Sequence, residues 1–259
     1  MTPQRWSWIG ACSTGSSHIS TGTSCQDAAA CIEFSTIDGS ALLAIVSDGA
    51  GSAEFGAVGS RLVVQCFSRN LREYWRQGQS ADDLTEEVVR DWLDDIRDHI
   101  TAAAQHRCAT PRSFAATLVA AIVLMDRVVV CHVGDGACVV RKSDDDQWEV
   151  PSWPAHGEYA SSTYFVTDDP QPQLRYVSKA GQYTKVAVFS DGLERLVLDF
   201  SNTVAFAPFF EPMFSALSDS KPRRARRLSA QLRQFLDSEH VIERTDDDKS
   251  LIVARKIVP

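Results

Sequence analysis

The sequence predicts an α+β fold in which helices are layered on antiparallel β-sheets. Apolar runs of strand length are grouped in blocks, and two long amphipathic stretches separate the first block from the second. A doubly wound parallel sheet would instead require strict alternation of strands and helices. Hydrophobic residues make up 44% of the 259 residues, and no stretch of low complexity divides the chain. We therefore expect one domain over residues 1–259.

The first block predicts strands at residues 8–9, 28–34 and 41–46. Helices are expected at about 54–77 and 83–105, because apolar residues recur there at helical spacing. In the first helix these are Val58, Leu62 and Cys66, and in the second they are Val88, Trp92, Ile96 and Ile100. Such stripes predict helix faces buried in a core.

The second block predicts strands at 114–124, 127–133 and 137–141, with Asp126-Arg127 as the tight turn of a hairpin. Residues 151–182 are rich in Pro, Ser and Gly, which predicts an irregular segment. A segment of that length in a compact domain is typically functional or mobile. A strand at 185–189, helices near 208–217 and 222–236, and a last strand at 250–256 complete the prediction.

Composition excludes several function classes. The formal net charge of -8 argues against nucleic acid as the main partner, since phosphate backbones need a basic face. No run approaches the about 20 apolar residues that span a bilayer, and the first residues lack the pattern of a signal peptide. The seven cysteines are odd in number and have no Cys-x-x-Cys spacing, so neither a disulfide framework nor a zinc site is indicated. We expect a soluble cytoplasmic protein.

Aspartates stand where predicted strands begin or end. Asp48 and Asp191 each follow an apolar run within Ser-Asp-Gly, and Asp135 follows a third run within Gly-Asp-Gly. Asp27 and Asp247 lie just before predicted strands. Singly, such an Asp is more often a turn former than a ligand. If all five converge, their mutual repulsion requires cations, and carboxylates suit Mg²⁺ or Mn²⁺. Two such ions can activate a water for attack on phosphorus.

Six short motifs together carry a resemblance to a known family. They occur in the order Gln26-Asp27-Ala28, Ser47-Asp48-Gly49-Ala50-Gly51, Ala116-Thr117-Leu118, Val133-Gly134-Asp135, Ser190-Asp191-Gly192-Leu193 and Asp247-Asp248-Lys249-Ser250. In this order the chain resembles the metal-dependent serine/threonine protein phosphatases of the 2C type, most closely their compact bacterial branch. The resemblance implies a four-layer α-β-β-α sandwich, two antiparallel sheets flanked by helix pairs, with a variable flap at about 151–182.

The resemblance also implies a role for each motif residue. Asp48 resembles the carboxylate that bridges two metal ions, and Gly49 the residue whose carbonyl binds the second ion. Asp191 and Asp247 resemble the other carboxylates of the first ion. Asp135 resembles the ligand of a third, looser ion, and Asp27 an acid of the metal centre that orients metal-bound water. The implied reaction is hydrolysis of phosphoserine or phosphothreonine on proteins by a metal-bridging hydroxide, with two or three Mn²⁺ or Mg²⁺ ions and no phosphoenzyme. The implied partner is a phosphoprotein, a serine/threonine kinase or its target.

Several positions depart from the family pattern. Gln26 replaces a frequent Glu ligand, Ala50 replaces a His found in many eukaryotic members, and Ala137 replaces an Arg. The Arg that binds substrate phosphate is absent near Gly22. These departures predict a weaker second metal site and favour His18 as a substrate-binding residue or a proton donor. They also support an alternative, a catalytically weak phosphatase-fold module that binds a phosphoprotein or kinase.

Three further features have plain structural interpretations. The spacing Cys66-x5-Arg72 matches cysteine-dependent phosphatases, but it lacks a glycine-rich loop and lies within a predicted helix. His132 lies inside a predicted strand and is expected to be a core histidine. The basic run Lys221–Arg227 predicts a solvated helix face, with a docking patch for an acidic partner as the sharper alternative.

Overall fold

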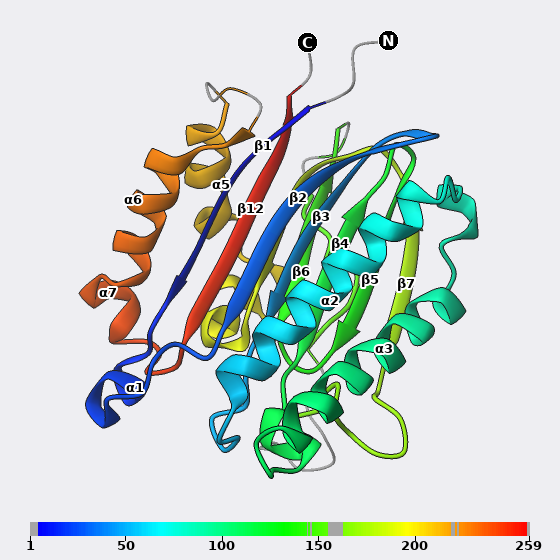
Figure 1. Cartoon of the computed structure of the whole chain (residues 1–259). Helices are drawn as coiled ribbons and strands as arrows, with labels where there is room; N and C mark the ends of the chain where they lie inside the picture. The colour runs from blue at the N-terminus through cyan, green and yellow to red at the C-terminus, as the bar shows by residue number, and fades with distance from the viewer. Residues whose placement is uncertain are drawn as a thin grey trace.

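Two five-stranded sheets face each other, and helices cover both outer faces (Figure 1). The computed structural model describes residues 5–143, 145, 147–154, 163–218, 221 and 223–257. The first sheet, sheet A, has the order β11 (Arg223–Arg224), β1 (Arg5–Ser13), β12 (Lys249–Ile257), β8 (Tyr183–Phe189), β6 (Ala137–Lys142). Sheet B has the order β2 (Ala28–Thr36), β3 (Gly39–Ser47), β4 (Leu118–Val123), β5 (Arg127–Val133), β7 (Arg175–Ala180). Neighbouring strands are antiparallel except β1 and β11.

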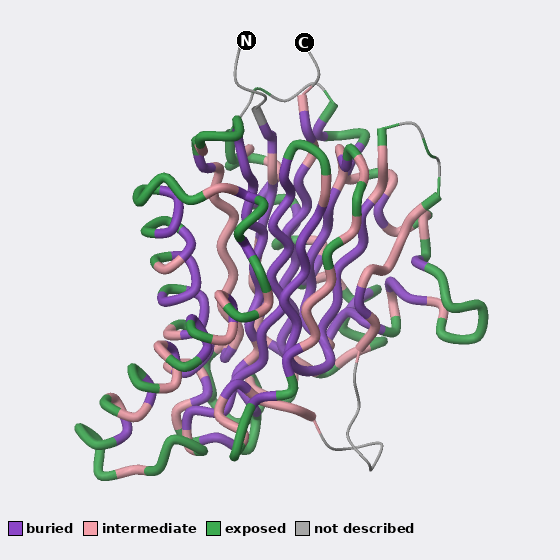
Figure 2. The backbone as a smooth tube through the Cα atoms, turned by 90° about the vertical axis from the view of Figure 1, so that its right-hand side faces the viewer, coloured by how far each residue is buried: buried purple, intermediate pink, exposed green. Residues whose placement is uncertain are grey.

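The continuous apolar runs reflect burial on both faces of each sheet. In β3, Leu43 and Ile45 point toward the helices, whereas Leu42 and Val46 belong to the core between the sheets. A strand covered on one side only would alternate apolar and polar residues. Figure 2 shows the central strands as buried along most of their length. The predicted four-layer sandwich is therefore confirmed, and so is the hairpin of β4 and β5, which pair from Leu118↔Val133. Its turn is Met125-Asp126 rather than the predicted Asp126-Arg127, because Arg127 begins β5 and its carbonyl accepts from Leu124 N at 2.9 Å.

Sheet B is covered by α2 (Gly56–Arg76) and α3 (Glu86–Gln105), the two predicted amphipathic helices. Trp92, Ile96 and Ile100 are buried in this outer core, as their spacing predicted. Sheet A is covered by α5 (Ala207–Ala216), α6 (Arg226–Leu236) and the short α7 (Glu239–Ile242). Among the helices of the described residues, none is long and apolar enough to cross a membrane.

Short elements complete the chain. They are α1 (Ser16–Thr21), the 3₁₀ turns η1 (Ala81–Asp83), η2 (Pro111–Phe114) and η3 (Asp191–Leu193), α4 (Glu194–Val197), and a small hairpin of β9 (Leu198–Asp199) and β10 (Val204–Ala205). Helix α1 was not predicted, because none of its residues is buried and it carries no apolar stripe.

Three predicted boundaries were wrong. Residues 175–180 are not irregular but form β7, an edge strand whose half-exposed residues leave no apolar run for the sequence to reveal. Residues 155–162 of the same predicted flap lie outside the described residues. Helix α6 begins at Arg226 rather than near 222, because Arg223 and Arg224 pair with β1 instead. Strand β4 begins at Leu118 rather than 114, because Phe114 lies in a 3₁₀ turn.

Candidate metal centre

Strand register places the five predicted aspartates at one end of the sandwich. Ala28 pairs with Ser47, so Asp27 just before β2 and Asp48 just after β3 lie side by side at the end of sheet B. Leu251 pairs with Phe189, so Asp247 and Asp191 lie at the matching end of sheet A. Asp135 lies on the connection from β5 in sheet B to β6 in sheet A. The cluster therefore forms across the seam between the two sheets.

Asp27 and Asp48 are fixed by buried hydrogen bonds. Ser190 Oγ donates to Asp27 Oδ2 at 2.8 Å. The main chain of Asp48 is held by Thr117, whose Oγ1 accepts from Asp48 N at 2.9 Å and whose amide donates to Asp48 O at 2.8 Å.

Glycine is needed in both Ser-Asp-Gly motifs because the backbone is crowded there. A Cβ on Gly49 would lie 2.4 Å from the carbonyl carbon of Gly56, and one on Gly192 would lie 2.0 Å from Asp248 O. These separations are far below van der Waals contact. Close approach of neighbouring backbone, rather than an unusual φ angle, therefore explains why Gly follows Asp48 and Asp191.

On the sheet A side, Asp191, Asp247 and Asp135 line a cavity of about 360 Å³. Thr163 and Gly192 line it too, and the Thr163 hydroxyl donates to Asp135 Oδ2. Two arginines, Arg195 and Arg244, lie at its margin. Glu194 and Asp246 line the cavity as well, so acidic groups outnumber the two arginines, and the cavity offers charges for both a cation and an anionic group.

Burial and mutual repulsion hold the cluster partly protonated. Burial raises the pKa of Asp48 well above its ordinary value, and the charges of Asp27 and Asp191 raise it further. Burial raises the pKa of Asp191 to about 8, with Asp135 and Asp247 adding to the effect. Burial also raises the pKa of Asp27 to about 6, although hydrogen bonds from neighbouring groups oppose the shift. Like charges gathered in a buried site favour the neutral forms until a cation compensates them.

The donor set fits divalent cations of the Mg²⁺ and Mn²⁺ class. Oδ1 of Asp27 and Oδ1 of Asp191 are buried and have no hydrogen-bond partner among the described residues. A buried carboxylate oxygen without a donor is costly, and a cation removes that cost. Every side chain of the cluster offers oxygen, the ligand that hard cations prefer.

Gln26 and His18 lie beside this centre. In the orientation that satisfies its hydrogen bonds, the Gln26 amide donates to Gly49 O at 2.9 Å and to Ala50 O at 3.2 Å. His18 Nδ1 lies 3.0 Å from Asp248 Oδ2, and its Nε2 lies 4.0 Å from the position of a Cβ on Gly51. The structure thus brings His18 to the turn that carries Asp48.

The sequence did not single out two buried groups that organise the centre. Asp248, only 1% exposed, accepts hydrogen bonds from the backbone amides of Gly15 at 2.7 Å and Gln26 at 2.5 Å. Ser190 links the two sheets through Asp27. The repetition of Ser before Asp48-Gly49 and Asp191-Gly192 was a usable signal, since Ser47 Oγ is also buried and donates to Thr117 O at 2.6 Å.

Two of the features interpreted as structural, Cys66 and His132, are buried. Cys66 lies in the middle of α2, and burial raises the pKa of its thiol, so the cysteine-phosphatase interpretation is excluded. His132 is fully buried with its pKa lowered by burial, and its Nδ1 lies 2.8 Å from Ser152 Oγ. Cys66, Asp95 and His99 also cluster, but Arg69 Nη2 lies 2.6 Å from Asp95 Oδ2 and 3.0 Å from His99 Nε2. The Arg69 guanidinium therefore supplies the positive charge that a metal ion would otherwise bring to Asp95 and His99.

Comparison with known proteins agrees with this geometry. The family model described as Protein phosphatase 2C matches residues 14–237. The chain belongs to the protein phosphatase 2C family. It is 34% identical over 251 residues to serine/threonine-protein phosphatase 3 of Escherichia coli (strain K12), covering 96% of this chain and 98% of that protein. The chain is accordingly a metal-dependent protein-serine/threonine phosphatase.

Solved structures support the fold of this phosphatase. The serine/threonine phosphatase Stp1 from Staphylococcus aureus matches with a TM-score of 0.65 at 20% identity, covering 97% of this chain and 95% of Stp1. The catalytic domain of the serine/threonine protein phosphatase PstP, solved with two manganese ions, matches with a TM-score of 0.61 at 15% identity, covering 98% and 100%. Nothing in these comparisons favours the alternative of a catalytically weak binding module.

Proposed function

We propose that this phosphatase hydrolyses phosphoserine and phosphothreonine in proteins, with two Mn²⁺ or Mg²⁺ ions and a third, looser ion. Asp48, Asp191, Asp247 and the carbonyl of Gly49 would hold the first two ions, and Asp135 the third. The observation that carries the proposal is the convergence of five carboxylates at one end of the sandwich, with buried oxygens of Asp27 and Asp191 lacking donors among the described residues. The two manganese ions in PstP support the same stoichiometry.

When bound, the ions neutralise the carboxylates and activate water for direct attack on phosphorus. The protein's own side chains then orient the attacking water and donate a proton to the departing oxygen. Asp27 is anchored through Oδ2 by Ser190, which leaves Oδ1 to accept a hydrogen bond from the attacking water. A carboxylate fixed in this way orients its partner without reorganisation during the reaction.

The substrate phosphoryl group would enter the cavity of about 360 Å³ beside Asp191. Arg195 and Arg244 at its margin supply the positive charge that the missing arginine near Gly22 does not. Guanidinium groups bind phosphate oxygens through charged hydrogen bonds. We assign His18 to the same substrate, as the group that donates a proton to the departing serine or threonine oxygen, since its ring lies beside the Asp48 turn.

The proposal also specifies a partner class and a compartment. Any phosphoserine or phosphothreonine substrate must be made by a kinase, so the partner is a serine/threonine kinase or its target. The seven cysteines are all free, and the cytoplasm keeps thiols reduced, which supports a cytoplasmic location.

The decisive experiment is hydrolysis of a phosphothreonine peptide by the purified chain with Mn²⁺, with Mg²⁺ and with excess chelator. We expect turnover that requires metal and disappears in Asp48→Asn. Asp98→Asn, an exposed change on α3, is the matched control and should retain full activity. Turnover that persists in chelator, or that survives in Asp48→Asn, would overturn the proposal.

A further inference from the structure

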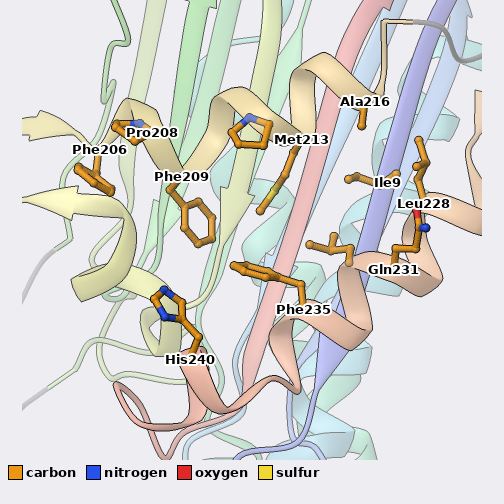
Figure 3. A pocket seen from close by; sticks show the side chains of 12 residues that line it. Ile9, Phe206, Pro208, Phe209, Met213, Ala216, Leu228, Gln231, Phe235 and His240 are labelled. Atoms are coloured by element: carbon orange, nitrogen blue, oxygen red, sulfur yellow. The ribbon is translucent and has the colours of Figure 1, made fainter.

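An apolar groove lies on the outer face of the molecule, between α5 and α6 (Figure 3). It has a volume of about 430 Å³, with Ile9 of β1 at its base. Phe209 and Met213 line it from α5, and Leu228 and Phe235 line it from α6. No carboxylate of the described residues lines this groove, so it is chemically unlike the metal centre.

The groove is apolar because each helix carries more apolar residues than the core can cover. Phe210 and Phe214 are fully buried against sheet A, so Phe209 and Met213 extend the apolar surface of α5 beyond the core. Likewise Leu232 and Leu236 of α6 are buried, whereas Leu228 and Phe235 are only half-buried. The Phe209 and Phe235 rings are in contact, with centroids 5.8 Å apart and planes inclined at 58°. An apolar surface that the core leaves uncovered is available for contact with a partner.

One end of the groove is strongly basic. Leu228 lines both the groove and an adjacent hollow that is otherwise formed by the run from Lys221 to Arg227. Lys221, Arg223, Arg226 and Arg227 are exposed, and no ion pair involves any of them within the described part of the chain. This concentration of positive charge stands out in a chain whose formal net charge is -8.

We propose that the groove binds a segment of a partner protein that carries apolar side chains next to several aspartates or glutamates. The apolar side chains would pack onto Phe209, Met213 and Phe235, and the acidic residues would lie against Arg226 and Arg227. An amphipathic helix laid into an apolar groove uses this division between apolar anchors and charged neighbours. Complementary charge at the rim selects the partner and speeds association.

A binding assay tests the proposal without requiring phosphatase activity. The probe is a fluorescein-labelled synthetic peptide of about 18 residues, long enough to span α5 as a helix, with Leu and Phe on one face and Glu at one end. Binding to the full chain is followed by fluorescence anisotropy. We expect saturable binding that weakens as salt rises, and at least about tenfold weaker binding, or 1.4 kcal/mol, when Glu is replaced by Lys or when the sequence is scrambled.

Two kinds of variant test whether the peptide binds in the groove and against the basic run. Met213→Glu should weaken binding about tenfold or more by placing a charge in the groove, and the double change Arg226→Glu with Arg227→Glu should do so without touching the core. Arg61→Glu, an exposed charge reversal on α2, is the matched control and should leave binding unchanged. Thermal melts followed by circular dichroism confirm that each variant is folded.

Three results would overturn the proposal. The first is no peptide binding, and the second is equal binding by the wild-type chain and the arginine double variant. The third is sedimentation as a dimer that Met213→Glu converts to a monomer, which would assign the groove to a second copy of the chain. Because none of these readouts is hydrolysis, they leave the phosphatase proposal untouched.

Discussion

Ser190 of sheet A donates a hydrogen bond of 2.8 Å to Asp27 of sheet B. Ser190 Oγ in turn accepts from the backbone amide of Ser250 at 2.9 Å, so a chain of hydrogen bonds runs from β12 across the seam to the carboxylate. All three groups are buried or nearly so. The relative position of the two sheets is therefore coupled directly to the position of a carboxylate at the metal centre.

Replacing Ser190 by Ala should lower both activity and stability. Asp27 would lose the donor that fixes Oδ2, and we expect kcat to fall about 10- to 100-fold, the usual effect of losing a partner that orients a metal-site group. The buried amide of Ser250 would lose its acceptor, which should reduce the free energy of unfolding by about 1–3 kcal/mol. Steady-state kinetics at saturating Mn²⁺ and urea denaturation measure the two effects.

The matched control is Ser47→Ala in the other Ser-Asp-Gly motif. Ser47 is equally buried, but its hydroxyl donates to a backbone carbonyl rather than to a carboxylate. The Ser47→Ala variant should lose about as much stability as Ser190→Ala, but its kcat should fall much less. Equal losses of kcat in the two variants would mean that Ser190 acts only through the fold.

The metal-free protein should become less stable as the pH rises from about 4 to 8. In the folded state, burial raises the pKa of Asp27 to about 6 and of Asp191 to about 8, above their ordinary value of 3.8. A group with a raised folded pKa contributes stability below its unfolded pKa and loses it as the pH rises through its folded pKa. The loss should therefore begin near pH 4, be steepest between pH 4 and 6 where both groups contribute, and continue to about pH 8 through Asp191 alone.

Thermal melts of the chelator-treated protein across this range measure the effect. Asp191→Asn, which cannot ionise, should lose less stability with rising pH than the wild type, and Asp98→Asn should follow the wild type. Added Mn²⁺ should restore stability at pH 8, because ions bind the ionised carboxylates. A wild-type melting temperature no more dependent on pH than that of Asp191→Asn would contradict the prediction.

Replacing Gln26 by Glu should strengthen metal binding. The Gln26 amide donates to Gly49 O, the carbonyl that we assign to the second ion, so the neutral amide competes with a cation for that oxygen. A carboxylate would add a negative ligand instead of a donor. We expect Mn²⁺ to bind about tenfold more tightly, or 1.4 kcal/mol, in isothermal titration calorimetry.

The same change should lower the stability of the metal-free protein, because it adds a buried charge beside other carboxylates. Gln234→Glu, on the exposed side of α6, adds the same charge far from the cluster and should change neither property. Unchanged or weaker Mn²⁺ binding in Gln26→Glu would show that the amide does not limit the second site.

Removing Arg195 or Arg244 should affect substrate binding more than turnover. Both line the acidic cavity, and both are exposed, so we expect each Ala variant to raise KM for a phosphothreonine peptide by only about three- to tenfold. The value of kcat should change little, since neither residue contacts the buried carboxylates that we assign to the ions. Arg76→Ala, at the end of α2, is the control. A fall in kcat with constant KM would assign these arginines to the chemical step.

Most aspartates of the metal centre were predictable, because the ends of buried strands can be recognised from a few neighbouring residues. An apolar run followed by Ser-Asp-Gly locates Asp48 and Asp191 at the end of buried strands, and the acids before the strands at residues 28 and 249 follow the same logic. Once antiparallel pairing is assumed, such residues meet at one edge. Helices α2 and α3 were predictable for a similar reason, since their apolar stripes report burial directly.

The sequence by itself thus determined the layers, the strand ends and the oxygen chemistry of the cluster, because each of these depends on residues close together along the chain. Only the tertiary structure decided that Ser190 reaches Asp27, that Asp248 holds Gly15 and Gln26, and that Arg195 and Arg244 share one cavity. Strand β7 and helix α1 also escaped prediction, since half-exposed residues carry no apolar pattern. These relationships join residues far apart in the chain through single side-chain contacts. Periodicity cannot encode such contacts, because they form only when two sheets have packed in one register.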